Sequence, residues 1–280
     1  MDDQQTSCCL LCLKKIDPSD CRTCEYCDLV ACSPRHLSVH QAWTGNQCLP
    51  FRVAIDPGLG RHYVAMRDIE PLELILTDSP SVIGPATKSR PVCLECLKPL
   101  VASPVVYCPG CGFPMCSDKC IREPRIHSRE CKLIERYRDV IPLDGQKDCP
   151  VYAAIFVLRF WLLKDEDPKE HREATFLMPG DLTDPDLNAV AKDLVKIIHE
   201  GFQLPQIRRE EILQYMGIKR TNANNMANLQ GRVGNILYPV YTLMNSHCYT
   251  NTRCKIHPEN FTIEVRAQRA IKAGEQITTR

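Results

Sequence analysis

The hydrophobic and polar positions of this 280-residue chain follow a period of two in two places. Residues 61–76 and residues 263–277 both alternate apolar and polar side chains on either side of a short turn. Pro71-Leu72 would form the first turn, and Gly274 supplies permissive backbone dihedrals for the second. The alternation predicts two half-buried β-hairpins.

The two alternating stretches also match each other residue by residue. When Ala65 is aligned with Ala267, the pairs that fall into register are Arg67 with Arg269, Ile69 with Ile271, Glu73 with Glu275, and Ile75 with Ile277. Two unrelated hairpins could coincide in this way, but these two flank everything between them. We therefore expect one domain that opens with the first stretch and closes with the second.

The middle of the chain has the longer period of helices. Residues 151–163 are apolar nearly all round, apart from Arg159, and predict a buried helix. Asp184-Pro185 is an N-cap followed by proline at the first helical position. The helix that starts there ends at Gly201 and carries an apolar stripe of Leu187, Val190, Leu194, Ile197 and Ile198.

A further helix is expected to begin at Pro205, with an inner face of Ile212, Leu213 and Met216. Other segments are polar or rich in turn residues and are expected to be connections. Residues 164–172 and the loop at Met178 are expected to be surface connections. Residues 84–91 are expected to be a linker into the second cysteine cluster.

Composition narrows the class of protein. Lys and Arg number 35 against 34 Asp and Glu, which argues against a dedicated nucleic-acid binder or a membrane-surface protein. No apolar run is long enough to cross a bilayer. The acidic start Met-Asp-Asp-Gln-Gln differs from a signal peptide, so we expect a reducing compartment. The 18 cysteines should then be thiols or metal ligands.

The cysteines between residues 93 and 131 are spaced as zinc ligands. They form Cys93-x2-Cys96, Cys108-x2-Cys111 and Cys116-x3-Cys120, followed by His127-x3-Cys131. Each close pair can place two sulfurs about 3.7 Å apart around a zinc ion, and these ligands suffice for two tetrahedral sites. A disulfide framework and scattered buried thiols are the weaker alternatives.

A similar but less regular cluster occupies residues 8–48. It runs Cys9-x2-Cys12, Cys24-x2-Cys27 and Cys32-x3-His36, with His40 and Cys48 after it. Cys8 could replace Cys9, and Cys21-x2-Cys24 offers a competing register. The eighth ligand is therefore open, and the cluster predicts either two zinc ions or one.

The order of three cysteine pairs and a His-x3-Cys resembles the MYND zinc finger, whereas the Cys-x-His-x2-Cys centre of a RING-type ubiquitin ligase is missing. In the MYND family the pairs interleave, which implies up to four zinc ions in this chain. The implied ligand sets are Cys93, Cys96, Cys116 and Cys120; Cys108, Cys111, His127 and Cys131; Cys9, Cys12, Cys32 and His36; and Cys24, Cys27, His40 and Cys48. In the last set the family's histidine would fall at Thr44, and His40 is the nearest substitute.

Residues 238–251, Tyr-Pro-Val-Tyr-Thr-Leu-Met-Asn-Ser-His-Cys-Tyr-Thr-Asn, resemble the Asn-His-Ser-Cys-x-Pro-Asn segment of SET domains. Residues 60–69 resemble the opening strand of that fold, and residues 271–278 its closing strand. With a finger inserted between them, the chain resembles the SET and MYND domain family. The extra N-terminal finger resembles arthropod members of it.

The fold that this resemblance implies is α+β: a β-rich SET domain split by a MYND finger and a helical insert, and preceded by a second MYND-like finger. The expected boundaries are residues 8–48 for the first finger, 51–85 for the opening SET part, 93–131 for the second finger, 132–236 for the helical insert and 237–280 for the closing SET part.

The family transfers methyl groups from S-adenosylmethionine to lysine side chains of histones and other proteins. The resemblance therefore implies a protein-lysine methyltransferase in transcriptional regulation, resident in nucleus and cytoplasm, whose fingers bind proline-rich peptides. The residues that it assigns to the cofactor are Gly60, Arg61, His62, Asn222, Asn245, Ser246 and His247. Ser246-His247 reverses the family's order, and Asn224 replaces a phenylalanine.

The family's catalytic tyrosine follows the closing strand, whereas this sequence ends Ile277-Thr-Thr-Arg280. We assign no catalytic residue and expect a truncated or inactive SET domain, which makes a zinc-stabilised corepressor-type scaffold the alternative function. Direct DNA binding is the weakest option, because a solvated helix face explains the basic strip better. That strip is Arg122, Arg125, Arg129, Lys132 and Arg136.

Overall fold

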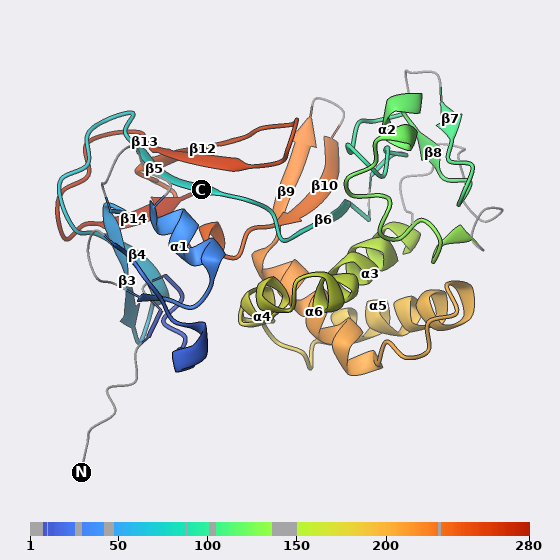
Figure 1. The fold of residues 1–280 in the computed structure, drawn as a ribbon, viewed down its shortest axis with the longest axis horizontal. Helices are drawn as coiled ribbons and strands as arrows, with labels where there is room; N and C mark the ends of the chain where they lie inside the picture. The colour runs from blue at the N-terminus through green and yellow to red at the C-terminus, as the bar shows by residue number, and fades with distance from the viewer. Residues whose placement is uncertain are drawn as a thin grey trace, which may run out of the picture. The chain divides into compact units, whose positions relative to one another are not determined.

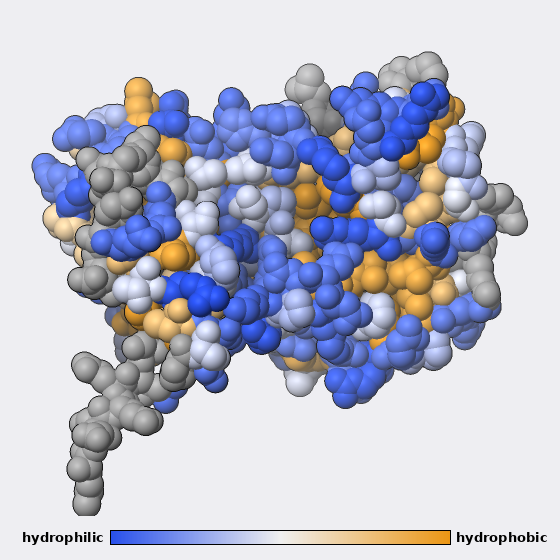
Figure 2. Space-filling model, in the orientation of Figure 1, coloured by the Kyte–Doolittle hydropathy of each residue, from blue (hydrophilic) through white to orange (hydrophobic). Residues whose placement is uncertain are grey.

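The structure is a computed structural model that describes residues 8–9, 11–25, 30–41, 48–87, 89–100, 105–135, 150–228 and 231–280 (Figure 1). The chain divides into two compact units, Met1–Ser79 with Pro239–Arg280, and Pro80–Tyr238. The fold is α+β, with sheets in both units and the long helices in the second. Among the described helices, none is both long and apolar enough to cross a membrane. The face shown in Figure 2 is mostly hydrophilic, with hydrophobic residues in smaller areas.

Two sheets form most of the first unit. Their strand orders are β11-β14-β4-β3 and β12-β13-β5. The bounds are β3 Phe51–Asp56, β4 Gly60–Ala65, β5 Leu74–Asp78, η4 Tyr241–Leu243, β11 Asn245–Ser246, β12 Thr252–Ile256, β13 Ile263–Ala267 and β14 Gln276–Thr279. The antiparallel pair β3 and β4 brings the rings of Phe51 and Tyr63 within 4.3 Å of each other in the core.

The two alternating stretches pair with each other, so the prediction of two separate hairpins is wrong. The N–H of Ala65 donates to the carbonyl of Glu275, and the N–H of Ala267 donates to that of Glu73, both at 2.9 Å. As a result β4 pairs with β14, and β5 pairs with β13. Because both copies carry the same alternation, each satisfies the backbone of the other as well as a hairpin partner would.

The cysteine-rich segment of the first unit folds around short elements. They are η1 Pro18–Asp20, β1 Arg22–Thr23, β2 Val30–Ala31 and α1 Pro34–Gln41. The carboxylate of Asp17 accepts the N–H of Ser19 at 3.0 Å and starts η1. In α1 the two histidines, His36 and His40, are four residues apart and therefore lie on one face of the helix. Both are buried.

The second unit combines helices with a three-stranded sheet in the order β6-β10-β9. The bounds are β6 Val82–Pro85, β7 Val106–Tyr107, β8 Pro114–Met115, α2 Asp118–Arg122, α3 Pro150–Glu166, α4 Pro168–Thr175, α5 Pro185–Lys196, η3 Ile197–Gly201, α6 Arg209–Asn222, β9 Asn224–Asn228 and β10 Gly231–Leu237. The predicted apolar helix is α3, which is buried over residues 151–160. Phe160 of α3 stacks on Tyr215 of α6, with ring centroids 4.3 Å apart.

Residues 164–166 and 168–172 are helical, so the prediction of a connection over residues 164–172 is wrong, although most of these residues are exposed as predicted. α3 continues to Glu166, and α4 begins directly after Asp167. The Asp167 carboxylate accepts the N–H groups of Lys169 and Glu170 at 3.1 and 2.9 Å. This is the same Asp-Pro helix start as Asp184-Pro185, which begins α5 as predicted.

Two other predicted boundaries also need correction. α6 begins at Arg209 and not at Pro205, because the Glu211 carboxylate accepts the N–H of Arg208 at 3.1 Å and fixes the first turn there. Gly84 belongs to β6 and not to a linker. A Cβ at that position would lie 2.9 Å from Cβ of Phe156, so the glycine allows α3 to pack closely on the strand.

Candidate metal and cofactor sites

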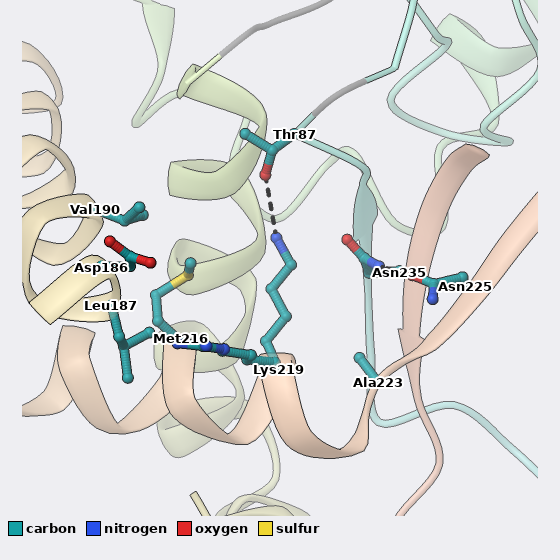
Figure 3. A pocket seen from close by; sticks show the side chains of 10 residues that line it. Thr87, Asp186, Leu187, Val190, Met216, Lys219, Ala223, Asn225 and Asn235 are labelled. Carbon is teal, nitrogen blue, oxygen red and sulfur yellow. Dashed lines mark hydrogen bonds between the residues drawn. The ribbon is translucent and has the colours of Figure 1, made fainter. Parts of the chain in front are cut away.

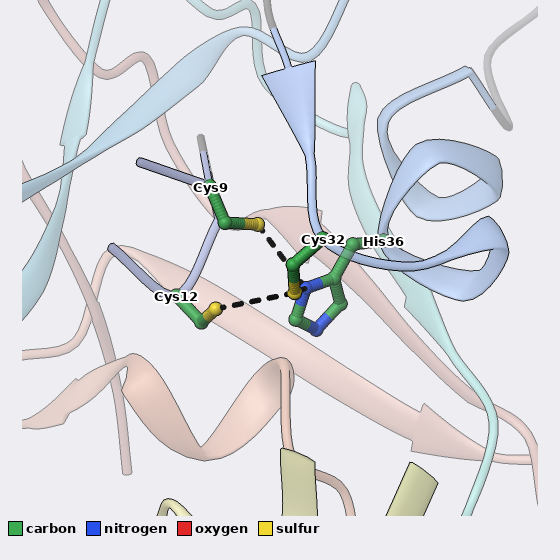
Figure 4. A group of neighbouring side chains, drawn as sticks. All are labelled: Cys9, Cys12, Cys32 and His36. Carbon is green, nitrogen blue, oxygen red and sulfur yellow. Dashed lines mark hydrogen bonds between the residues drawn. The ribbon is translucent and has the colours of Figure 1, made fainter. Parts of the chain in front are cut away.

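Cysteine and histidine side chains converge beside α1 in the first unit (Figure 4). Cys9, Cys12, Cys32 and His36 make up the Cys9 group, and their ligand atoms all lie within 4.8 Å of one another. The sulfurs of Cys12 and Cys32 are 3.7 Å apart. Nδ1 of His36 lies 3.3 Å from the sulfurs of both Cys9 and Cys32. Such spacing is that of ligands around one small ion.

The three Cys-x2-Cys pairs that begin at Cys9, Cys93 and Cys108 share one kind of turn. The residue after the second cysteine is left-handed, with φ of 60° at Leu13, 57° at Leu97 and 77° at Gly112. Its N–H donates to the carbonyl of the first cysteine at 2.8–2.9 Å. This turn directs both sulfurs to one side, which is what a shared metal ion needs.

A second group in the first unit, the Cys24 group, contains Cys24, His40 and Cys48. Its fourth predicted ligand, Cys27, lies within residues 26–29, outside the described part of the chain. Burial lowers the pKa of His40 and so favours the neutral ring that metal binding requires. α1 therefore supplies one histidine to each of the two groups.

The second unit holds two further groups that match the interleaved sets of the sequence analysis. The Cys93 group is Cys93, Cys96, Cys116 and Cys120, and the Cys108 group is Cys108, Cys111, His127 and Cys131. In the Cys93 group the sulfur of Cys116 lies 3.5 Å from that of Cys96 and 3.6 Å from that of Cys120. In the Cys108 group the sulfurs of Cys108 and Cys131 are 3.5 Å apart.

The donor chemistry of these groups fits zinc. Zinc takes four thiolate or imidazole ligands in a tetrahedron with Zn–S bonds of about 2.3 Å, which places neighbouring sulfurs about 3.7 Å apart. The side-chain hydrogen bond between Cys93 and Cys96 lowers the pKa of Cys93 and raises that of Cys96, so Cys93 is the first thiol of this pair to ionise. Four protein ligands close the site, so a zinc ion there would serve the fold.

Buried charges orient His127. Its Nδ1 lies 3.1 Å from a carboxylate oxygen of Glu130, which also accepts a hydrogen bond from Arg159 of α3 at 2.5 Å. Burial raises the pKa of Glu130, but the charge of Arg159 and the His127 ring outweigh it and hold this pKa below its ordinary value. Arg159 also donates to the carbonyls of Ile83 and Leu94, both at 2.8 Å. A carboxylate behind a ligand histidine fixes the ring's orientation.

Sequence patterns do not reveal the residues that support the Cys93 and Cys108 groups. Glu95 is buried and accepts three successive N–H groups, from residues 125 to 127, at 2.9–3.0 Å. In the sequence, Glu95 and Glu130 each lie between two ligands of one Cys or Cys/His pair. Glu95 binds backbone N–H groups, and Glu130 binds the His127 ring. The lone charge of Arg159 in an apolar helix was a further signal, because a buried cation requires a partner.

Part of the basic strip in the second finger is occupied by ion pairs. Nε of Arg125 lies 3.9 Å from Glu95, and a guanidinium nitrogen of Arg129 lies 3.1 Å from Glu166. Arg136 falls outside the described residues. These ion pairs partly neutralise the positive charge of the strip, which the sequence alone would leave free for DNA.

Two segments that the sequence assigns to the cofactor meet in the first unit. Gly60 begins β4 with a φ of 67°, which favours glycine. Asn245 of β11 donates a side-chain N–H to the carbonyl of Leu59 at 3.2 Å. Nothing lies within 4 Å of a Cβ built on Gly60, so the backbone beside it is open to a ligand. An open glycine turn next to a carboxamide fits the polar end of a small cofactor.

The side chains of the two residues after Gly60 contact backbone carbonyls of the protein itself. Arg61 donates to the carbonyl of Cys12 at 3.2 Å. His62 is buried, and its Nδ1 lies 3.1 Å from the carbonyl of Gly60. Both side chains therefore help to fix the turn at Gly60.

Ser246 and His247 follow Asn245 where β11 pairs in parallel with β14. The backbone N–H of His247 donates to the carbonyl of Thr279 at 2.8 Å, and its ring Nδ1 accepts the N–H of Tyr249 at 3.1 Å. The buried Tyr241 places its hydroxyl 2.7 Å from Oγ1 of Thr279 and lines a cavity of about 710 Å³. The reversed Ser-His order thus lies in a well-bonded strand pair beside a cavity of the first unit.

Asn222 belongs to the second unit and ends α6. Its amide donates to the carbonyl of Met178 at 2.8 Å. A cavity of about 500 Å³ lies beside this helix end between α5, α6, β9 and β10 (Figure 3), and its lining includes Ala223 but not Asn222. The Lys219 amino group enters it, 3.4 Å from the hydroxyl of Thr87.

Comparison with models of protein families identifies one family. The family model described as SET domain matches residues 9–280. The solved SET domain of LSMT bound to lysine and AdoHcy is 13% identical, with 86% of this chain and 51% of that chain covered and a TM-score of 0.39. Rubisco LSMT bound to AdoMet is 16% identical, with 83% and 48% covered and a TM-score of 0.37. The chain spans about half the length of these structures. No curated protein matches the sequence.

Proposed function

This chain belongs to the SET domain family, and on that premise we propose that it is a protein-lysine N-methyltransferase that uses S-adenosylmethionine. The observation that carries the proposal is the family match over residues 9–280, nearly the whole chain. The contact between Asn245 and the Leu59 carbonyl supports it, because it joins the two segments that the resemblance assigns to the cofactor.

In this proposal the chain's own residues bind and orient. The cofactor supplies the activated methyl group, so the reaction needs alignment of amine, methyl and sulfur and no protein nucleophile. The open turn at Gly60 and the Asn245 carboxamide would hold its polar end. His62 supports the turn through the Gly60 carbonyl, and Arg61 through Cys12. A desolvated lysine would complete the geometry.

We further propose that the cysteine-rich segments are MYND-type fingers, as in arthropod members of the SET and MYND domain family. The four cysteine and histidine groups support this proposal. The fingers would bind proline-rich peptides, and the lysines methylated would be those of histones or other proteins in transcriptional regulation, in nucleus and cytoplasm. A corepressor-type scaffold that relies on the fingers alone is the second candidate function, and the same groups favour it.

The decisive experiment is calorimetry of S-adenosylmethionine with the zinc-loaded chain. We expect micromolar binding, and Asn245→Ala should weaken it by about tenfold because a carboxamide is lost at the turn. Asn260→Ala is the matched control, since Asn260 caps a turn elsewhere in the first unit by accepting the N–H of Thr262. A radiolabelled methyl-transfer assay on histones and cell extract then tests turnover. Absence of binding with full zinc content would favour the scaffold.

A further inference from the structure

The Cys9 group is joined to the core of the first unit through the residue beside its histidine. Arg35 precedes His36 in α1, and its guanidinium donates to the carboxylate of Asp78 at 2.6 Å and to the carbonyl of Ser79. Asp78 is only 1% exposed. A buried carboxylate depends on its cation, so the position of α1 and the stability of this carboxylate are coupled.

Asp78 also binds the backbone of the segment before β11. Its other oxygen accepts the N–H groups of Val240 and Tyr241 at 3.1 and 2.9 Å. The hydroxyl of Tyr63 donates to the carbonyl of Val240 at 2.7 Å and holds the same turn from β4. Through η4 this turn leads directly into Asn245. The finger helix and the candidate cofactor strand therefore share one buried carboxylate.

A second link runs from the same group to the other cofactor segment. Arg61 lies next to Gly60 and donates to the carbonyl of Cys12, a member of the Cys9 group. The amide of Asn245 then connects back to the carbonyl of Leu59. Both links begin in the Cys9 group, and they end on the two segments that meet at Asn245.

We propose that the Cys9 group, with a metal ion bound, positions the candidate cofactor face of the first unit. It fixes Arg35 and Arg61, and these two arginines hold the turn before β11 and the turn at Gly60. Arg35 is a positioning residue that acts through Asp78. The functional meaning of this inference rests on the proposed use of S-adenosylmethionine, whereas the link from the finger to residues 240–241 does not.

The test compares Arg35→Ala with Arg22→Ala in the zinc-loaded full chain. Arg22 is an exposed arginine of the same finger that donates to the carbonyl of its own neighbour, Cys21. Arg35→Ala should keep the zinc content of the parent and speed amide hydrogen exchange at Val240 and Tyr241 by about a hundredfold. It should also weaken cofactor binding by about tenfold or more. Arg22→Ala should leave all three quantities unchanged.

The role of the metal is tested by His36→Ala against His127→Ala. Each variant should lose about one zinc ion. Only His36→Ala should speed exchange at residues 240 and 241, because every contact in the two links lies within the first unit. His36→Cys restores a ligand and should restore slow exchange. Equal effects of the two alanine variants on this exchange would overturn the proposal.

Loss of folding can be separated from loss of positioning. The double variant Arg35→Ala/Asp78→Asn leaves no uncompensated buried charge, so we expect it to fold with the zinc content of the parent and to exchange faster at residue 240 than Asp78→Asn alone. Exchange as slow as in Asp78→Asn would refute the role of Arg35. A parent chain that binds no S-adenosylmethionine but shows the expected exchange pattern would refute the proposed function and leave this inference standing.

Discussion

The backbones of Ile69 and Ile271 bind each other reciprocally, with N–H to carbonyl distances of 2.8 and 3.0 Å. Both side chains are buried. The equivalence of the two stretches continues into the turns, where Leu72 has a φ of 69° and its counterpart Gly274 a φ of 84°. The second copy therefore uses the residue type that a left-handed backbone favours, and the first copy does not.

Leu72→Gly should stabilise the first unit. A left-handed leucine costs about 1–2 kcal/mol, and the added backbone freedom of glycine in the unfolded chain offsets part of the relief. Leu72 is 56% exposed, so little burial is lost. We expect the free energy of unfolding in urea to rise by about 0.5–1 kcal/mol.

Gly274→Ala is the reciprocal variant. No atom lies within 4 Å of the added Cβ, so its cost comes from the backbone alone. We expect a loss of about 1 kcal/mol by the same measurement. An equal change in both variants, or a less stable Leu72→Gly, would contradict the equivalence of the two turns.

Glu130→Gln should weaken zinc binding by the second finger without removing a ligand. The substitution takes away the negative charge that faces His127 and Arg159. Loss of such a supporting carboxylate typically costs about 10–100-fold in metal affinity. Competition with a chromogenic chelator would measure the change. Glu123→Gln, on the exposed end of α2, is the matched control and should bind zinc with the affinity of the parent.

His171 should make the second unit less stable in mild acid. Burial first, and then the charge of Lys164, lowers its pKa below the ordinary 6.5. The unfolded chain therefore takes up the proton first, so the contribution of His171 is complete above pH 6.5 and is lost as the pH falls below it. The Tm of His171→Gln should fall less steeply than that of the parent between about pH 7 and 5.5. Parallel curves would show that His171 does not carry this dependence.

Gly84→Ala should destabilise the second unit. The new methyl group would meet Cβ and Cδ2 of Phe156 at 2.9 Å, and Phe156 is fully buried. Overpacking of this kind costs about 1–3 kcal/mol, which thermal unfolding would detect as a lower Tm. Gly58→Ala places its Cβ in ordinary contact with the Asp56 side chain and should leave the Tm unchanged.

Local signals in the sequence are sufficient to predict an element whose start depends only on neighbouring residues. Asp184-Pro185 starts α5 because an aspartate cap and a proline act within a single turn. Asp167-Pro168 carries the same signal, but the polar residues around it are also typical of a surface connection. The shared alternation indicates that the two stretches are equivalent, but periodicity does not determine which strands pair with each other. That choice depends on the reciprocal bonds at Ile69 and Ile271.

The candidate sites also contain residues that the sequence predicts and residues that it does not. Spacing identified the cysteine pairs between residues 93 and 131, and the family resemblance implied the interleaved sets that converge in space. Neither could reveal Asp78, whose importance lies in contacts with Arg35 and with the backbone of Tyr241, both far away in the sequence. A lone aspartate at the end of a strand has no pattern that distinguishes it. Buried charge pairs of this kind become visible only when the tertiary structure is known.

The pairing between the two β-stretches also has a consequence for synthesis of the chain. The strands β4 and β5 leave the ribosome long before their partners β14 and β13 are made. The second unit is continuous in sequence, and its ends are joined by the bond from the N–H of Ser81 to the carbonyl of Leu237. It can close while β4 and β5 still have open edges, which are the template for wrong pairing. During synthesis, strands of the first unit therefore wait for their partners longer than the strands of the second unit do.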